Sequence, residues 1–288
     1  MNGTIYMPVG EVCSSISDTY REKKNMVTLI NTSDVLEGRV LNHERVPNSN
    51  LKGQFKKTFQ QDDILYSEIR PQNRRFAYVD FSPIDYIAST KLMVIRAKKD
   101  VVSPKYLYYF LKNSSTVAEL QLLAETRSGT FPQITFSEVA NLTIPVPSLA
   151  VQEVIVQTMQ CLEDKITCNE QINDNLQQQA FSVFDNLIAN AENNDYTVSD
   201  YAFLNPKRTL AKNQVARSID MSQLSTSGAF PSGWEMKPFN GGMRFTNGDT
   251  LLARITPCLE NGKTAFIDFL DDGEVAFGST EYIVLAPK

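Results

Sequence analysis

The sequence predicts an α+β fold in which one mixed α/β domain is present twice, with a long coiled-coil helix between the copies. Three observations support this. Residues 63–80 resemble residues 249–268, a strand-like segment containing Ser-Thr follows both, and residues 148–190 contain no proline or glycine. We therefore expect a first domain at 1–147, a spacer helix at 148–190 and a partial second domain at 191–288.

The repeat can be followed residue by residue. Its matched positions keep their order and nearly their spacing: Asp63, Leu65, Ile69 and Pro71 correspond to Asp249, Leu251, Ile255 and Pro257, and Ser89-Thr90 corresponds to Ser279-Thr280. A solenoid unit spans only a few tens of residues, so a repeat this long indicates a copied domain.

Each copy has the pattern of a domain that mixes strands and helices. In the first copy, β-rich segments at 64–69, 76–81 and 92–96 predict strands. Ser103-Pro104 predicts the start of a helix, and 141–147 predicts a short strand followed by proline. The second copy has no counterpart of these last two elements, so we expect it to be truncated.

A basic turn connects the first two predicted strands. Proline at position 71 interrupts strand pairing and leaves the neighbouring basic side chains outside. An arginine fork can bond guanine O6 and N7 together, and lysine neutralises phosphate, so DNA contact is one interpretation and a solvated hairpin tip is the other. Recurrence of a basic residue in both copies, Arg75 and Lys263, favours DNA contact. The turn contains Arg70, Arg74 and Arg75, and Lys52, Lys56 and Lys57 lie before the first of the two predicted strands.

Residues 148–190 predict one long helix with an apolar seam. Apolar residues recur at alternating steps of three and four, which is the coiled-coil pattern, and 43 residues would extend about 60 Å. Two asparagines on the seam would fix register and partner choice. Because such a seam needs cover, we expect a partner on it. The seam residues are Ile155, Met159, Leu162, Ile166, Asn169, Asn173, Leu176, Ala180, Val183 and Leu187.

Composition excludes several classes of protein. The chain has 288 residues, is 42% hydrophobic and has a net charge of −5. No apolar stretch approaches the roughly 20 residues of a membrane span and no signal peptide is visible, so we expect a cytoplasmic protein without membrane contact. The four cysteines lack metal-binding spacing, so we expect no metal site.

The sequence also shows none of the common catalytic motifs. The one histidine, His43, lies in a polar turn, and no glycine-rich phosphate loop is present. Asp63 and Glu68 could form part of a nuclease site, but Glu68 corresponds to Arg254 in the second copy. A metal-binding carboxylate would not be replaced by arginine in its duplicate, so the sequence predicts a protein that is not an enzyme and has no catalytic residue.

The order of these segments resembles the DNA specificity subunits of type I restriction-modification systems. The resemblance rests on DDILYSEIRP, FAYVD, ASTKLMVIRAK, SPKYLYYFLK and GTFPQITFSEVANLTIPVPSLAVQ, on the long helix, and on the second copy. In that family, two target recognition domains each read one half of a split DNA sequence. Long helices join the domains and hold methyltransferase subunits.

The resemblance implies a set of DNA-facing residues. The basic turn and the loop at 127–133 fall where the first domain of the family faces DNA, and the corresponding turn of the second copy adds three residues. The implied residues are Lys56, Lys57, Arg70, Asn73, Arg74, Arg75, Arg127, Ser128, Thr130 and Gln133 in the first copy, and Arg254, Asn261 and Lys263 in the second.

The resemblance also implies partners. We expect double-stranded DNA, methyltransferase subunits on the long helix and a restriction subunit through the complex, and a second copy of this chain is a further alternative. S-adenosylmethionine, ATP and magnesium would belong to the partner subunits, so no cofactor is expected here. The alternative is a truncated or silent specificity cassette that binds methyltransferase without recognising a complete DNA site.

Overall fold

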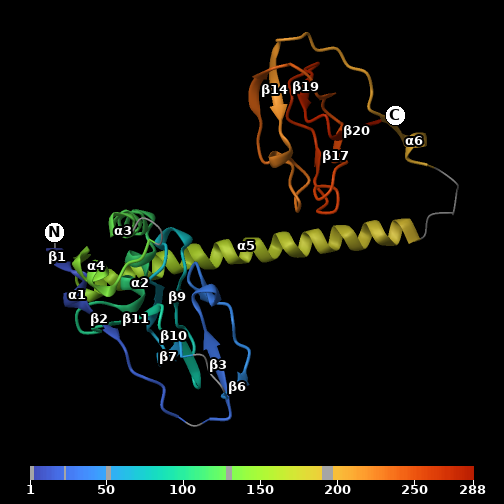
Figure 1. Cartoon of the computed structure of the whole chain (residues 1–288). Helices are drawn as coiled ribbons and strands as arrows, with labels where there is room; N and C mark the ends of the chain where they lie inside the picture. Colours follow the sequence, from blue (N-terminus) through green and yellow to red (C-terminus); the bar gives the residue numbers. More distant parts are fainter. Residues whose placement is uncertain (1–2, 23, 50–52, 128–131, 190–196) are drawn as a thin grey trace. The chain divides into compact units, whose positions relative to one another are not determined.

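The computed structural model describes residues 3–22, 24–49, 53–127, 132–189 and 197–288. The chain divides into two compact units, Met1–Val183 and Phe184–Lys288 (Figure 1). Both mix strands with helical segments, which confirms the predicted α+β fold. Within the described ranges, no helix combines the length and the apolar character needed to cross a membrane.

Unit 1 is built on two four-stranded sheets. The central sheet consists, in spatial order, of β2 (Cys13–Ile16), β11 (Leu92–Ala97), β8 (Ile64–Ser67) and β9 (Phe76–Tyr78). The second sheet consists of β6 (Val46–Pro47), β3 (Met26–Ile30), β10 (Tyr86–Ser89) and β7 (Phe55–Lys57), with β3 and β10 parallel. The predicted strands at 64–69, 76–81 and 92–96 are therefore confirmed as β8, β9 and β11.

The central sheet is buried on both faces because its side chains alternate between two cores. Tyr66 and Ile95 point into a core with helix α2, whereas Leu65 and Val94 point into a core with the second sheet. This explains why β8 is fully buried and reads as a continuous apolar run.

Short helices and a two-stranded sheet complete unit 1. Ser103 precedes α2 with proline at its first position, as predicted. The 3-10 turns η1 and η2 and the hairpin β4–β5 lie on the side of β9. The elements are α1 (Val9–Val12), α2 (Pro104–Lys112), α3 (Ser114–Arg127), α4 (Phe136–Asn141), η1 (Thr32–Asp34), η2 (Pro71–Asn73), β4 (Val35–Leu36), β5 (Arg39–Val40), and β1 (Ile5–Pro8) paired with β12 (Thr143–Val146).

Unit 2 repeats the strand order of unit 1. Its central sheet consists of β13 (Ala202–Leu204), β20 (Tyr282–Pro287), β17 (Thr250–Ala253) and β18 (Thr264–Phe266). Its second sheet consists of β15 (Glu235–Pro238), β14 (Val215–Ile219), β19 (Ala276–Gly278) and β16 (Met243–Phe245), with β14 and β19 parallel. α6 (Val198–Tyr201) and η3 (Met221–Gln223) take the places of α1 and η1. The predicted duplication is therefore confirmed at the level of topology.

One sheet face of unit 2 has no cover among the described residues. The positions that in unit 1 face α2 are half-buried in unit 2, at Leu252, Ile283 and Leu285. Phe266, which corresponds to Tyr78, is 41% exposed. The core between the two sheets is nevertheless complete, because Leu251, Val284 and Ile219 are fully buried.

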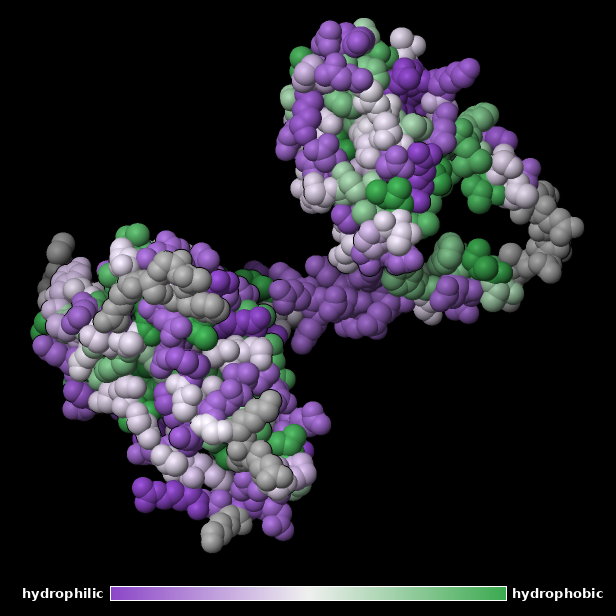
Figure 2. All heavy atoms as spheres, in the orientation of Figure 1, coloured by the Kyte–Doolittle hydropathy of each residue, from purple (hydrophilic) through white to green (hydrophobic). Residues whose placement is uncertain are grey.

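Helix α5 (Leu149–Ala189) has 41 residues and confirms the predicted long helix, whereas its role as a spacer stays a prediction. Only Gln152 and Val156 in it are buried. Figure 2 shows exposed apolar side chains toward its C-terminal end, where Phe181, Leu187 and others lie open to solvent.

In each central sheet, a buried aspartate directly precedes one strand: Asp63 precedes β8, and Asp249 precedes β17. Asp63 accepts from the Gln60 N–H at 2.8 Å and from two nitrogens of Arg96 at 2.7 Å. Asp249 accepts from the Thr246 N–H at 2.8 Å and from Arg208 at 2.7 Å. Burial raises the pKa of Asp249 above its ordinary value, and the bonds from Thr246 and Arg208 oppose that shift.

The two arginines come from different places in the fold. Arg96 lies on β11, whereas Arg208 follows β13, and the position of β20 that corresponds to Arg96 is Ala286. Unit 2 therefore satisfies the same buried carboxylate from another segment. The two units share the position of the carboxylate, but the arginine that pairs with it comes from a different segment in each unit.

Removing Arg96 should destabilise unit 1, because Asp63 is 1% exposed and would keep an unpaired charge. Arg96→Ala is expected to lower the free energy of unfolding by about 3 kcal/mol, measured by urea denaturation followed by circular dichroism. Lys24→Ala is the control, because the Lys24–Glu22 pair is exposed on both sides and should contribute less than about 1 kcal/mol. Equal losses in the two variants would contradict this role of Arg96.

Candidate nucleic-acid interface

The turn between β8 and β9 holds its basic residues on an unusual backbone. Arg70 and Arg74 flank η2 and have positive φ angles of 45° and 52°. A long side chain at positive φ costs free energy, and such strain is concentrated at functional sites. The turn is closed by bonds from the Asn73 N–H to the Arg70 carbonyl and from the Arg74 N–H to the Pro71 carbonyl, both 2.9 Å.

Helix α3 supports this turn from one side. Gln121 accepts from the Gln72 N–H at 3.2 Å, and Arg74 donates to the Ser114 hydroxyl at 2.9 Å. The Arg74 guanidinium also lies 3.9 Å from the Glu37 carboxylate, with 38% of its side chain exposed. These contacts hold the turn in a defined conformation, in which the side chain of Arg74 is partly exposed.

The segment after the predicted loop lies beside the turn. Gln133 pairs with Ile69 in an antiparallel bridge, the Arg70 N–H donates to the Pro132 carbonyl at 3.0 Å, and the Ile134 N–H donates to the Glu68 carbonyl at 2.9 Å. The structure thus brings together two of the regions that the sequence indicated, although they are far apart along the chain. Ser128 and Thr130 lie outside the described residues, and Arg127 is described only as the last residue of α3.

Arg75 and Lys263, the recurring basic pair, make equivalent contacts in the two units. Arg75 donates to the carbonyls of Ser33 and Val35 at 3.0 and 3.4 Å, and Lys263 donates to the Met221 carbonyl at 2.8 Å. Each thereby fastens its turn to the neighbouring 3-10 segment. Their recurrence has a structural reason, so it does not by itself indicate DNA contact, which stays a prediction for both.

The two lysines of β7 differ in their exposure and in their contacts. Lys57 donates to the carbonyls of Thr90 and Leu92 at 3.0 and 2.8 Å, and burial lowers its pKa below the ordinary value. Lys56 points to the other face of the strand and is exposed. Of the two, Lys56 is the one available for a phosphate.

Unit 2 places its predicted residues on the corresponding turn. Asn261 is exposed, and its N–H donates to the Pro257 carbonyl at 3.0 Å. Arg254 is 54% exposed and donates to Glu281 at 2.8 Å.

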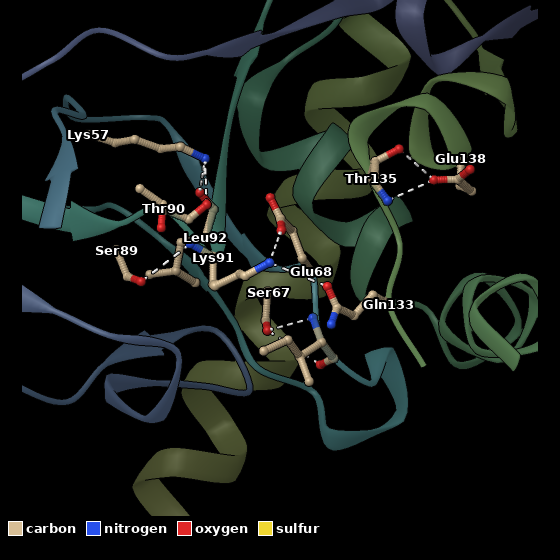
Figure 3. Close-up of polar contacts among 11 residues, drawn as sticks. Lys57, Ser67, Glu68, Ser89, Thr90, Lys91, Leu92, Gln133, Thr135 and Glu138 are labelled. Carbon is tan, nitrogen blue, oxygen red and sulfur yellow. Dashed lines mark hydrogen bonds and ion pairs between the residues drawn. The ribbon is translucent and has the colours of Figure 1, made fainter. Parts of the chain in front are cut away.

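A polar cluster beside the turn of unit 1 was missed by sequence reasoning (Figure 3). The Lys91 ammonium lies 3.5 Å from the Glu68 carboxylate and 3.4 Å from the side-chain oxygen of Gln133. In unit 2 the corresponding pair is Arg254 with Glu281, so the charges are exchanged between the strands. The repeat contains the signal that could have found this pair, because Lys91 corresponds to Glu281 just as Glu68 corresponds to Arg254.

Helix α5 contacts unit 1 along one side only. Lys105 donates to Gln160 at 3.0 Å, Tyr109 donates to Glu163 at 2.8 Å, and Lys112 pairs with Glu163. The predicted seam lies about 60–100° round the helix from this side, and its apolar members from Ile155 to Leu187 are 37–67% exposed. An apolar surface of this length is the kind that a partner covers.

A cavity of about 370 Å³ lies between α5, α2 and the β4–β5 hairpin. Its lining is mainly charged or aromatic and includes Arg39, Asp80, Tyr108 and Glu170. Within the part of the chain that the structure describes, no group of three or more His, Cys, Asp or Glu side chains is placed to hold a metal ion.

The repeated α/β scaffold, with a 41-residue helix between the two copies in the sequence, defines a class of duplicated α/β proteins. The family model described as type I restriction modification DNA specificity domain matches residues 6–178, so the chain belongs to that family.

The chain is also similar to two type I specificity subunits. The chain is 43% identical over 158 residues to the Type I restriction enzyme HindI specificity subunit of Haemophilus influenzae, covering 55% of this chain and 34% of that protein. It is 34% identical over 96 residues to the EcoAI specificity subunit of Escherichia coli, covering 32% of this chain and 16% of that protein. The matches thus span about a third or less of these relatives' length.

Two solved structures share the fold over the whole chain. One, from a study of complex assembly and conformational transition of the type I R-M system, has a TM-score of 0.57 at 15% identity, with 76% of that chain covered. The other, the HsdS subunit from Thermoanaerobacter tengcongensis, has a TM-score of 0.53 at 16% identity, also with 76% covered.

The contacts of Arg75 predict a stability effect. Arg75→Ala is expected to lower the free energy of unfolding by about 1.5–3 kcal/mol, because hydrogen bonds from a charged donor to two carbonyls are lost. Arg75→Lys should lose less than half as much, since Lys263 performs the same task in unit 2. Urea denaturation measures both, with the exposed Lys56→Ala as control. A stability of Arg75→Ala equal to that of the control would show that these bonds contribute nothing.

Proposed function

We propose that this chain is the DNA-recognition subunit of a type I restriction-modification complex and reads a split double-stranded target without altering it. The observation that carries the proposal is the repeated scaffold: two units with the same strand order, a basic turn at the same position in each, and a 41-residue helix between the two central sheets. Membership of the specificity family supports the same conclusion.

In this proposal, unit 1 reads one half-site through the turn at 70–74 and the adjacent Gln133, and unit 2 contacts the other half-site through the turn at 254–263. The strained Arg70 and Arg74 face the DNA, and Lys56 neutralises phosphate. A helix of 41 residues extends about 60 Å, and a turn of duplex is about 34 Å, so the half-sites lie one to two turns apart.

Methyl transfer and cleavage belong to partner subunits in this proposal, together with S-adenosylmethionine, ATP and magnesium. The contribution of this chain is to bind DNA and to hold the methyltransferase subunits on the open seam of α5. A restriction subunit joins through the complex.

A salt-dependent binding experiment tests the recognition role. In gel shifts of the chain purified with a methyltransferase subunit, Lys56→Ala and Arg74→Ala should each weaken DNA binding. Each should also reduce the slope of log affinity against log salt by about one, because each removes one positive charge that displaces counterions from the DNA. Lys24→Ala, outside the interface, should leave the slope unchanged. Unchanged slopes in both variants would contradict the proposed interface.

The same experiment separates the alternative function. If the complex forms but binds every duplex with equal affinity, the chain is a silent cassette that docks methyltransferase without reading DNA.

Substitutions on α5 test the docking role. Leu162→Asp and Ile166→Asp place a charge on the apolar seam and should reduce co-purification with a methyltransferase subunit at least ten-fold. Cys161→Asp is the control, because Cys161 is exposed on the helix but lies off the seam. Circular dichroism should be unchanged in all three variants. Docking as strong in Leu162→Asp as in Cys161→Asp would exclude the seam as the binding surface.

A further inference from the structure

Lys91, Glu68 and Gln133 meet at the edge of the candidate DNA interface although they come from three segments. Figure 3 shows the Lys91 ammonium between the Glu68 carboxylate and the side-chain amide of Gln133. The distances from its nitrogen are 3.5 Å to Glu68 and 3.4 Å to the Gln133 oxygen.

The main chain fixes these three residues relative to one another. The Glu68 N–H donates to the Lys91 carbonyl at 3.0 Å, and the Ile134 N–H donates to the Glu68 carbonyl at 2.9 Å. The Lys91 N–H donates to the Ser89 hydroxyl at 3.3 Å. The side chains therefore meet on a backbone that is already held by hydrogen bonds.

The chemistry of the ammonium decides how the Gln133 amide is turned. Lysine only donates hydrogen bonds, so it selects the amide oxygen and leaves the NH₂ group directed elsewhere. Figure 3 shows this nitrogen on the side away from Lys91. Because Gln133 pairs with Ile69, next to Arg70, the NH₂ group lies beside the basic turn.

We propose that Lys91 is a positioning residue that determines base specificity by holding Gln133 with its NH₂ group toward the DNA. This rests on the proposed recognition function. A donor at this place selects a base edge that offers an acceptor in the major groove: guanine O6 or N7, adenine N7, or thymine O4.

Unit 2 shows that the fold accepts the opposite polarity at this pair. The Arg254 N–H donates to the Glu281 carbonyl at 3.0 Å, and the Glu281 N–H donates to the Ser279 hydroxyl at 3.1 Å, as in unit 1. The side chains form an ion pair of 2.8 Å with the charges exchanged.

Exchanging the charges in unit 1 should therefore turn the amide over. In Glu68→Arg/Lys91→Glu, the carboxylate at position 91 accepts from the Gln133 NH₂ group, and the amide oxygen turns toward the DNA. An acceptor there selects a base that offers a donor, which is cytosine N4 or adenine N6.

Selection of binding sites from a randomised duplex library tests this, using the full chain purified with a methyltransferase subunit. The double variant should change the preferred base at one position of one half-site, with about ten-fold discrimination, and leave the other positions unchanged. Arg254→Glu/Glu281→Arg is the matched control in unit 2 and should not change that position. Gln133→Ala should abolish the preference at the same position in both backgrounds.

The outcomes separate the two proposals. A selective wild-type chain whose preferences are the same in the double variant overturns only the role of Lys91. A change of preference that persists after Gln133→Ala also overturns it, because Lys91 would then contact the DNA itself. A wild-type chain without selectivity overturns the recognition function and this inference together. If the double variant does not fold, Lys91→Met should lose the preference at the same position, and an unchanged preference there contradicts the inference.

Discussion

The exposed apolar seam of α5 is the main physical constraint on this chain, because an apolar surface of this length needs cover. Gln152 and Val156 are the buried residues of this 41-residue helix, so most of its amphipathic surface is not covered within unit 1, although covering such a face is the main way in which a long helix is stabilised. The contacts that do exist, through Gln160 and Glu163, fasten one side of its first half to α2. The remaining apolar seam is exposed.

The two units share their strand order and their buried aspartate, but they differ in the polar side chains around them. Both units keep the strand order, the buried aspartate at the mouth of the middle strand, and a basic residue that fastens the turn to a 3-10 segment. The arginine that pairs with the aspartate comes from a different segment in each unit, and the ion pair beside the turn is reversed. A scaffold of this kind can change the chemistry of its surface without changing its core.

Sequence patterns were sufficient for the elements that depend on local signals. Apolar residues at steps of three and four predicted α5, β-rich segments predicted β8 and β11, and Ser103-Pro104 predicted the start of α2. Contacts made across the chain were beyond such patterns. The segment at 132–134 pairs with 68–70, and helix α3 supports the turn, but neither is written in local periodicity. For the same reason Lys57 and Arg75 could be recognised as basic but not as donors to backbone carbonyls. Lys91 was missed because only comparison of both strands in both copies reveals the exchanged charges.

If two similar units read two half-sites and α5 sets their separation, the affinity for DNA depends on the spacing between the half-sites. This dependence is measured with the chain purified together with a methyltransferase subunit, on duplexes in which the spacing is changed one base pair at a time. We expect one preferred spacing, with affinity falling at least ten-fold when half a turn, about 5 base pairs, is inserted. Equal affinity at every spacing would show that the two units do not read half-sites at a fixed separation.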